Sequence, residues 1–232
     1  MKRALTFAGA VALAVSNSSA STMPDPVNPT CPKELNWSNN RTMRFTLDTS
    51  SGARVLKAEG KVDEAAAETL QDALTTNAPI DEIWVRSPGG DARAGNEAGR
   101  IIRKAGIPTR IPAGWACFSA CNFVFMGGPI RFVDPGGQFV VHMFTHLGDK
   151  QAVREEIARD ADAAIGLIGE VEQDSALLAS EDNDFLIRMG ISRKLLTEVM
   201  YQQKAISSAA DKSTRRCLTR EETLKYNVAN AR

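Results

Sequence analysis

Residues 83–90 have the sequence IWVRSPGG, in which a short apolar strand runs directly into a turn with two glycines. On either side of this stretch, extended and helical patterns alternate. Strands are predicted at residues 44–48, 54–62, 83–85, 109–111, 130–133 and 139–143. Helices are predicted from Asp63 to Thr76 and at residues 96–105 and 119–126. Alternation of this kind is typical of an α/β domain with parallel strand pairing.

The pattern changes from Lys150 onward. Apolar residues recur at helical spacing and predict one long helix running toward Ser180, with further helical segments at residues 184–189 and 193–202. We therefore expect one domain over residues 41–232, with a C-terminal helical extension at residues 150–205.

The N-terminus has the layout of a cleaved secretory signal. Lys2 and Arg3 precede an apolar run at residues 4–15, and small residues lead up to Ala20. We expect a signal peptide at residues 1–20, cleavage after Ala20, and a periplasmic or secreted protein. A short N-terminal helix that is retained is the alternative. Residues 21–40 are expected to form a disordered leader, because the segment begins with many Pro, Asn, Ser and Thr residues.

The overall composition excludes several classes of protein. The 28 basic and 28 acidic residues cancel, and no basic run is present, which argues against nucleic-acid binding. Only two histidines are available, so no multi-histidine metal centre is expected, and no metal or other cofactor is predicted. Outside the signal, no stretch is long and apolar enough for a transmembrane helix.

The chain has four cysteines, which are Cys31, Cys117, Cys121 and Cys217. An exported protein can keep disulfides. Four cysteines allow three pairings, and the sequence does not choose among them. Free thiols and a metal site at the pair spaced four residues apart are the alternatives.

Two residues could carry hydrolytic chemistry. Ser119 is predicted at the start of a buried helix, where N–H groups and the helix dipole favour developing negative charge. His142 lies in the apolar strand at residues 139–143 and could serve as the general base that a nucleophilic serine requires. An ordinary N-cap serine and a core histidine are the alternatives.

The order and spacing of these features resemble the proteolytic subunit of the Clp protease, within the Clp-protease/crotonase-like fold. The resemblance rests on the turn at residues 88–90, Gly95, Ser119, Pro135 and His142, and extends weakly to the last fifteen residues. It implies a parallel sheet of repeated β-β-α units wrapped by helices. Because Clp-type subunits form rings, it also implies a homo-oligomer.

Carried over residue by residue, the resemblance implies roles for the site residues. Ser119 would be the nucleophile and His142 the general base, and the N–H groups of Gly90 and Ala120 would form the oxyanion hole. The chain departs from the family in having cysteines on both sides of Ser119, where a disulfide would hold the nucleophile turn in place.

The third catalytic residue also departs from the family pattern. The family's aspartate position falls on Arg215, which cannot orient an imidazolium, and Asp211 is the nearest substitute. Related exported peptidases of this fold use a serine–lysine pair, so Lys150 is an alternative base, although an exposed lysine is mostly protonated at neutral pH.

The leading hypothesis is an exported serine hydrolase, in particular an ATP-independent peptidase that acts on peptides or unfolded polypeptides. One alternative is a binding or scaffold module that has kept the fold without strong catalysis. Another is an acyl-thioester enzyme of the crotonase type, using the same oxyanion hole.

Overall fold

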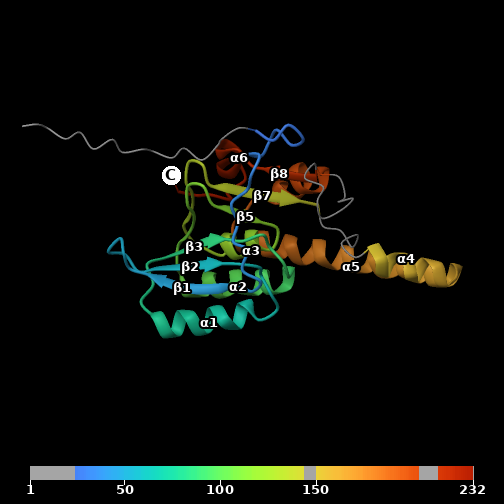
Figure 1. The fold of residues 1–232 in the computed structure, drawn as a ribbon, viewed down its shortest axis with the longest axis horizontal. Helices are drawn as coiled ribbons and strands as arrows, with labels where there is room; N and C mark the ends of the chain where they lie inside the picture. The colour runs from blue at the N-terminus through green and yellow to red at the C-terminus, as the bar shows by residue number, and fades with distance from the viewer. Residues whose placement is uncertain (1–23, 144–149, 204–213, 232) are drawn as a thin grey trace, which may run out of the picture.

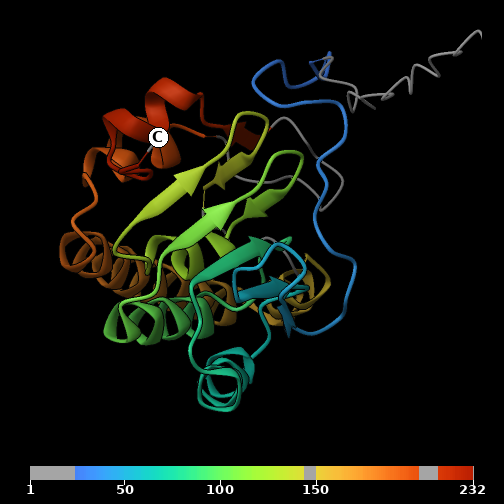
Figure 2. The ribbon, with the colours of Figure 1, turned by 90° about the vertical axis from the view of Figure 1, so that its left-hand side faces the viewer.

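Two β-sheets form the centre of the molecule, and helices cover them on the outside (Figures 1 and 2). The structure is a computed structural model that describes residues 24–143, 150–203 and 214–231. Strand and helix alternate along residues 44–142, so the prediction of a mixed α/β fold is confirmed. No helix in the described ranges combines the length and apolarity needed to cross a membrane.

The larger sheet has five strands in the order β1-β2-β3-β4-β6. These strands are β1 (Arg44–Asp48), β2 (Val55–Glu59), β3 (Glu82–Arg86), β4 (Thr109–Ile111) and β6 (Arg131–Val133). β1 and β2 pair antiparallel, and the remaining neighbours pair parallel. The parallel pairing expected from the strand–helix alternation is therefore present in β2, β3, β4 and β6.

The smaller sheet has the order β5-β7-β8, with β5 (Ala116–Phe118), β7 (Gln138–His142) and β8 (Arg215–Cys217). β5 pairs parallel and β8 antiparallel to β7, and β8 places Arg215 directly opposite His142. Neither β5 nor β8 was predicted from the sequence, because each has only three residues and depends on partners far along the chain.

Helices α1 (Ala66–Asn77), α2 (Ala92–Ala105) and α3 (Cys121–Met126) connect the strands. The C-terminal part contains α4 (Lys150–Arg159), α5 (Ala161–Arg188), a π-helical turn at Leu195–Val199, a 3-10 turn at Met200–Gln202, and α6 (Arg220–Lys225). Figure 1 shows α4 and the start of α5 extending to one side of the sheets.

The predicted helix boundaries need two corrections. α2 begins at Ala92 rather than at residue 96, because the Asp91 side chain accepts a hydrogen bond from the Ala94 N–H (2.7 Å) and caps the helix. The long helix predicted from Lys150 is broken before Ala161, where Asp160 caps a new helix through the Ala163 N–H (2.8 Å). α5 then continues to Arg188, so it includes residues 184–188 of the separate segment predicted at residues 184–189.

The prediction of disorder is wrong for residues 24–40. A disulfide joins Cys31 to Cys217, and the Asn28 side chain donates a hydrogen bond to the Arg215 carbonyl. Further along, the Asn36 carbonyl accepts a hydrogen bond from the Ala116 N–H (2.9 Å). Polar composition alone suggested disorder, whereas a covalent bond and backbone hydrogen bonds hold this segment to the smaller sheet. The expected signal peptide at residues 1–20 lies outside the described residues.

Glycines allow α2 and α3 to approach each other closely. A Cβ atom on Gly99 of α2 would lie 2.4 Å from the Phe123 carbonyl oxygen and 2.8 Å from the Phe185 ring of α5. A Cβ on Gly127, just after α3, would lie 2.3 Å from the Gly99 carbonyl oxygen. α3 begins two residues after Ser119, so this packing helps to fix where the chain places the serine.

We predict that Gly99→Ala lowers the free energy of unfolding by about 1–3 kcal/mol, because the added methyl group overpacks a rigid contact between backbones. Urea denaturation measures the change. Gly166→Ala is the matched control, because Gly166 also lies within a helix but has nothing within 4 Å of the added Cβ. The control should gain up to about 1 kcal/mol from helix propensity. Equal effects of the two substitutions would contradict the packing argument.

Candidate active site

Ser119 lies in the sharp turn between β5 and α3. Its φ of 57° is in the left-handed region, which is uncommon for a residue other than glycine. Such backbone strain is often found at functional sites, where the surrounding structure maintains it. Here the Ser119 N–H donates to the Val140 carbonyl (3.4 Å), and the Ser119 carbonyl accepts from the Asn122 N–H (2.8 Å). The turn is fixed at both ends, and α3 begins two residues after Ser119 rather than at it.

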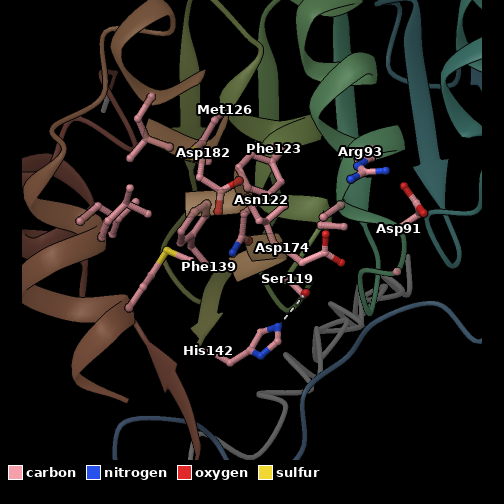
Figure 3. Close-up of a pocket in the computed structure, with 18 residues that line it drawn as sticks. Asp91, Arg93, Ser119, Asn122, Phe123, Met126, Phe139, His142, Asp174 and Asp182 are labelled. Atoms are coloured by element: carbon pink, nitrogen blue, oxygen red, sulfur yellow. Dashed lines mark hydrogen bonds between the residues drawn. The ribbon is translucent and has the colours of Figure 1, made fainter. Parts of the chain in front are cut away.

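His142 ends β7 and faces Ser119 (Figure 3). Its Nε2 atom lies 2.7 Å from the Ser119 Oγ, which is hydrogen-bonding distance. The Phe118 ring packs against the imidazole with a centroid distance of 4.8 Å. The two residues singled out in the sequence therefore lie side by side, in the geometry of a nucleophile and its general base.

Burial lowers the pKa of His142, because the charged imidazolium is poorly solvated there. The nearby backbone of Met143 acts to raise the pKa, although it forms no hydrogen bond of normal geometry with the ring. The positive charge of Arg215 lowers the pKa further. At neutral pH the ring is thus neutral, the form that can accept a proton from Ser119.

The second ring nitrogen of His142 has a different environment. Nδ1 is buried, and no atom of the described residues forms a hydrogen bond with it. Arg215 occupies the facing position on β8, with its guanidinium carbon 5.2 Å from the Phe118 ring centroid. Asp211 lies outside the described residues, and so does the Lys150 side chain. Within the described part of the chain, the site is a serine–histidine pair without an orienting carboxylate.

The turn at Gly89 and Gly90 lies against the nucleophile turn. A Cβ atom on Gly89 would be 2.6 Å from the Ser119 Cβ and 3.0 Å from the Ala120 nitrogen, so only glycine fits. Two backbone hydrogen bonds hold this turn to Val62, from Val62 N–H to the Gly89 carbonyl (2.9 Å) and from Asp91 N–H to the Val62 carbonyl (2.7 Å).

The N–H groups of Gly90 and Ala120 donate no hydrogen bond within the described residues, and both residues line the same cavity as Ser119. Unused backbone N–H groups beside a nucleophile can stabilise the oxyanion of a tetrahedral intermediate. The backbone placement is that expected of an oxyanion hole.

All four cysteines are paired, which resolves the pairing that the sequence left open. Besides Cys31–Cys217, a disulfide joins Cys117 of β5 to Cys121 at the start of α3. Both sulfurs of this second bridge belong to fully buried residues on either side of Ser119. The bridge thus closes the five-residue segment that carries the serine.

A cavity of about 480 Å³ opens beside Ser119 and His142. Its volume is within the range of small-molecule and peptide side-chain sites. Its lining combines apolar side chains with the carboxylates of Asp91, Asp174 and Asp182 (Figure 3). Asp174 and Asp182 were not predicted from the sequence as site residues. A signal was available, since residues 174, 178, 182 and 186 are spaced by four and share one face of α5.

Comparisons with known proteins support the fold. No protein-family model matches the chain, and no curated protein matches it. Among solved structures, a variant of ClpP1 from Listeria monocytogenes matches with a TM-score of 0.51 and 16% identity, covering 76% of this chain and 88% of that one. ClpP1 from the same organism matches with a TM-score of 0.49, the same identity and the same coverage. The chain therefore has a Clp-protease-like fold.

We predict that Asp182→Asn stabilises the protein increasingly as the pH rises from about 4 to 7. Burial, with a smaller contribution from Glu181, raises the pKa of Asp182 to about 7. The native state therefore keeps a proton that the unfolded chain loses near pH 4, and the wild-type protein loses stability across this window. Above pH 7 the variant should be about 2–4 kcal/mol more stable, and below pH 4 the two should be similar.

Urea denaturation at several pH values checks this expectation. Asp174→Asn is the matched control, because it neutralises an exposed carboxylate on the same helix. The interpretation of Asp182 is wrong if both variants show the same pH dependence as the wild type.

Proposed function

We propose that this protein is a serine hydrolase, and specifically a peptidase, with Ser119 as nucleophile and His142 as general base. The observation that carries the proposal is the 2.7 Å contact between Ser119 Oγ and His142 Nε2 at the edge of an open cavity. The Clp-protease-like fold is consistent with this activity, since it is the fold of the ClpP1 structures that the chain resembles.

The proposed reaction proceeds through an acyl-enzyme. Neutral His142 takes the Ser119 proton as Oγ attacks the carbonyl carbon of the scissile bond. The N–H groups of Gly90 and Ala120 stabilise the oxyanion of the tetrahedral intermediate. The histidine then protonates the leaving amine, and a water molecule activated by the same histidine hydrolyses the ester.

The surroundings of His142 indicate slow catalysis. The imidazolium that forms during the reaction meets the positive charge of Arg215, which lowers the pKa of the ring. In serine hydrolases, replacing the orienting carboxylate typically costs about four orders of magnitude in rate without abolishing the reaction. We therefore expect a low turnover number.

The proposed substrates are short peptides and unfolded polypeptides, cleaved without ATP. We place the protein in an exported, oxidising compartment, with a signal peptide removed after Ala20. Two buried disulfides support this placement, because such bonds persist mainly outside the reducing cytosol. A homo-oligomer remains part of the proposal.

A binding or scaffold module is the second candidate function. Arg215 favours it, since this residue stands opposite His142 where an orienting acid would be expected. In that case a stably folded Ser119→Ala variant would keep the function of the wild-type protein.

We predict that Ser119→Ala lowers cleavage of a fluorescein-labelled unfolded polypeptide at least about 50-fold, because a serine–histidine pair without an orienting carboxylate has less rate acceleration to lose than a complete triad. The measurement is the rate of fluorescence dequenching. Ser180→Ala is the matched control, because this exposed serine lies on α5 and does not line the cavity beside Ser119. Undiminished cleavage by the Ser119→Ala protein would exclude the proposed mechanism.

We predict that kcat/KM rises with pH to a plateau, with a midpoint below the ordinary histidine value of 6.5, since burial lowers the pKa of His142. Arg215→Gln removes a nearby positive charge and should move this midpoint upward, although burial keeps it below 6.5. Arg216→Gln is the control, because Arg216 points to the other side of β8 and pairs with Glu222. A midpoint that stays or falls in Arg215→Gln would contradict the assignment of His142 as the base.

A further inference from the structure

The cavity beside Ser119 has an apolar interior with one buried carboxyl group. The interior is lined by Phe123, Met126, Leu186 and Leu195, which come from α3, α5 and the following π-helical turn. Asp182 of α5 lies among them, and Figure 3 shows it at the far side of the cavity from His142. An apolar cavity with few polar groups is the usual form of a specificity pocket.

Asp182 is almost completely removed from solvent. Its exposed fraction is 7%, and it forms no hydrogen bond or ion pair within the described residues. A buried carboxylate without a partner costs several kcal/mol, so proteins usually pair such groups. The raised pKa of Asp182 is the consequence of this burial, to which Glu181 adds a smaller effect. Among the described residues, the carboxyl therefore has no cationic partner.

No side chain within residues 24–143, 151–203 and 214–231 supplies that partner. Arg93 also lines the cavity, but it is exposed, and Figure 3 shows it apart from Asp182, with Phe123 drawn between them. Asp174 lies on the same face of α5 as Asp182 and closer to Ser119. It is exposed, and its negative charge adds to the potential that a ligand meets before it reaches Asp182. Both carboxylates on this face favour a positively charged ligand.

We infer that Asp182 determines substrate specificity and that the cavity binds a lysine or arginine side chain on the acyl side of the scissile bond. This inference deepens the proposed peptidase function and rests on it for the identity of the ligand as a substrate side chain. The assignment to the acyl side follows from the cavity opening directly at Ser119 and at the oxyanion-hole residues Gly90 and Ala120.

A lysine or arginine side chain matches both the apolar lining of the cavity and its buried carboxyl group. The methylene stem of lysine or arginine packs on apolar surface while its head remains polar. A charge-assisted hydrogen bond from the head to Asp182 would satisfy the buried carboxylate. A purely apolar side chain would leave that carboxyl unpaired, which a site with buried polar groups discriminates against strongly.

A binding experiment tests the inference without requiring catalysis. The full chain carrying Ser119→Ala is titrated calorimetrically at pH 8 with butylguanidinium and with N-butylurea, which has the same shape and no charge. The cation is expected to bind at least about tenfold more tightly than the urea. Equal affinities, tighter binding of the urea, or binding of neither probe would overturn the inference.

Two variants identify the responsible group. Asp182→Asn should remove the preference for the cation, because it keeps the side-chain shape and removes the charge. Glu181→Gln is the matched control, since it removes the same charge one residue away and does not line the cavity. The preference should persist in that variant. A preference that survives Asp182→Asn unchanged would contradict the role of Asp182.

Turnover separates this inference from the proposed function. The wild-type protein is given two peptides that differ only in lysine or methionine on the acyl side, and kcat/KM is expected to favour lysine at least tenfold. Turnover of both peptides without preference would overturn the inference and leave the proposed function standing. Absence of all turnover, together with cation binding that depends on Asp182, would refute the peptidase proposal and support the pocket assignment.

Discussion

The site depends on one close contact between two backbone segments. The turn at Gly89 lies so near Ser119 and Ala120 that no side chain fits between them. Next to it, Ser87 and Cys117 form a parallel bridge, with hydrogen bonds of 3.1 Å in both directions, from Ser87 N–H to Ala116 carbonyl and from Phe118 N–H to Ser87 carbonyl. This contact joins the end of β3 to β5 and thereby brings the two sheets together. Ser119 and the N–H groups of Gly90 and Ala120, which donate no hydrogen bond within the described residues, meet where the sheets join.

Arg215 shapes the chemistry that this arrangement can support. Arg215 lies on β8 opposite His142. The Cys31–Cys217 disulfide and a hydrogen bond from Asn28 hold this strand against the N-terminal segment. A cation at this position disfavours the imidazolium, whereas an orienting carboxylate would stabilise it. Ser119 and His142 keep the contact through which a proton can be transferred. Within the described residues, they lack the negative charge that usually accelerates this transfer. Slow hydrolysis of selected substrates fits this combination better than rapid, general proteolysis.

Local patterns in the sequence predicted the central part of the fold and the serine–histidine pair. Strands such as residues 109–111 and the turn at residues 88–90 have short-range signals, and Ser119 and His142 stand at distinctive positions relative to them. The strand that carries Arg215 and the ordered segment around Cys31 gave no such signal, because a long-range disulfide and strand pairing across the chain create them. The four-residue spacing could have placed Asp174 and Asp182 on one face of α5, but no local signal shows that this face lies against the cavity.

The central claim is that Ser119 is an activated nucleophile. The most direct measurement is covalent labelling of the full chain by a fluorophosphonate, followed by mass spectrometry of the digested protein. A single phosphonyl adduct on Ser119, formed by the wild-type protein and lost in His142→Ala, is the predicted result. Absence of an adduct with both oxidised and reduced protein, or equal labelling of Ser119 without His142, would contradict the role of Ser119 as an activated nucleophile.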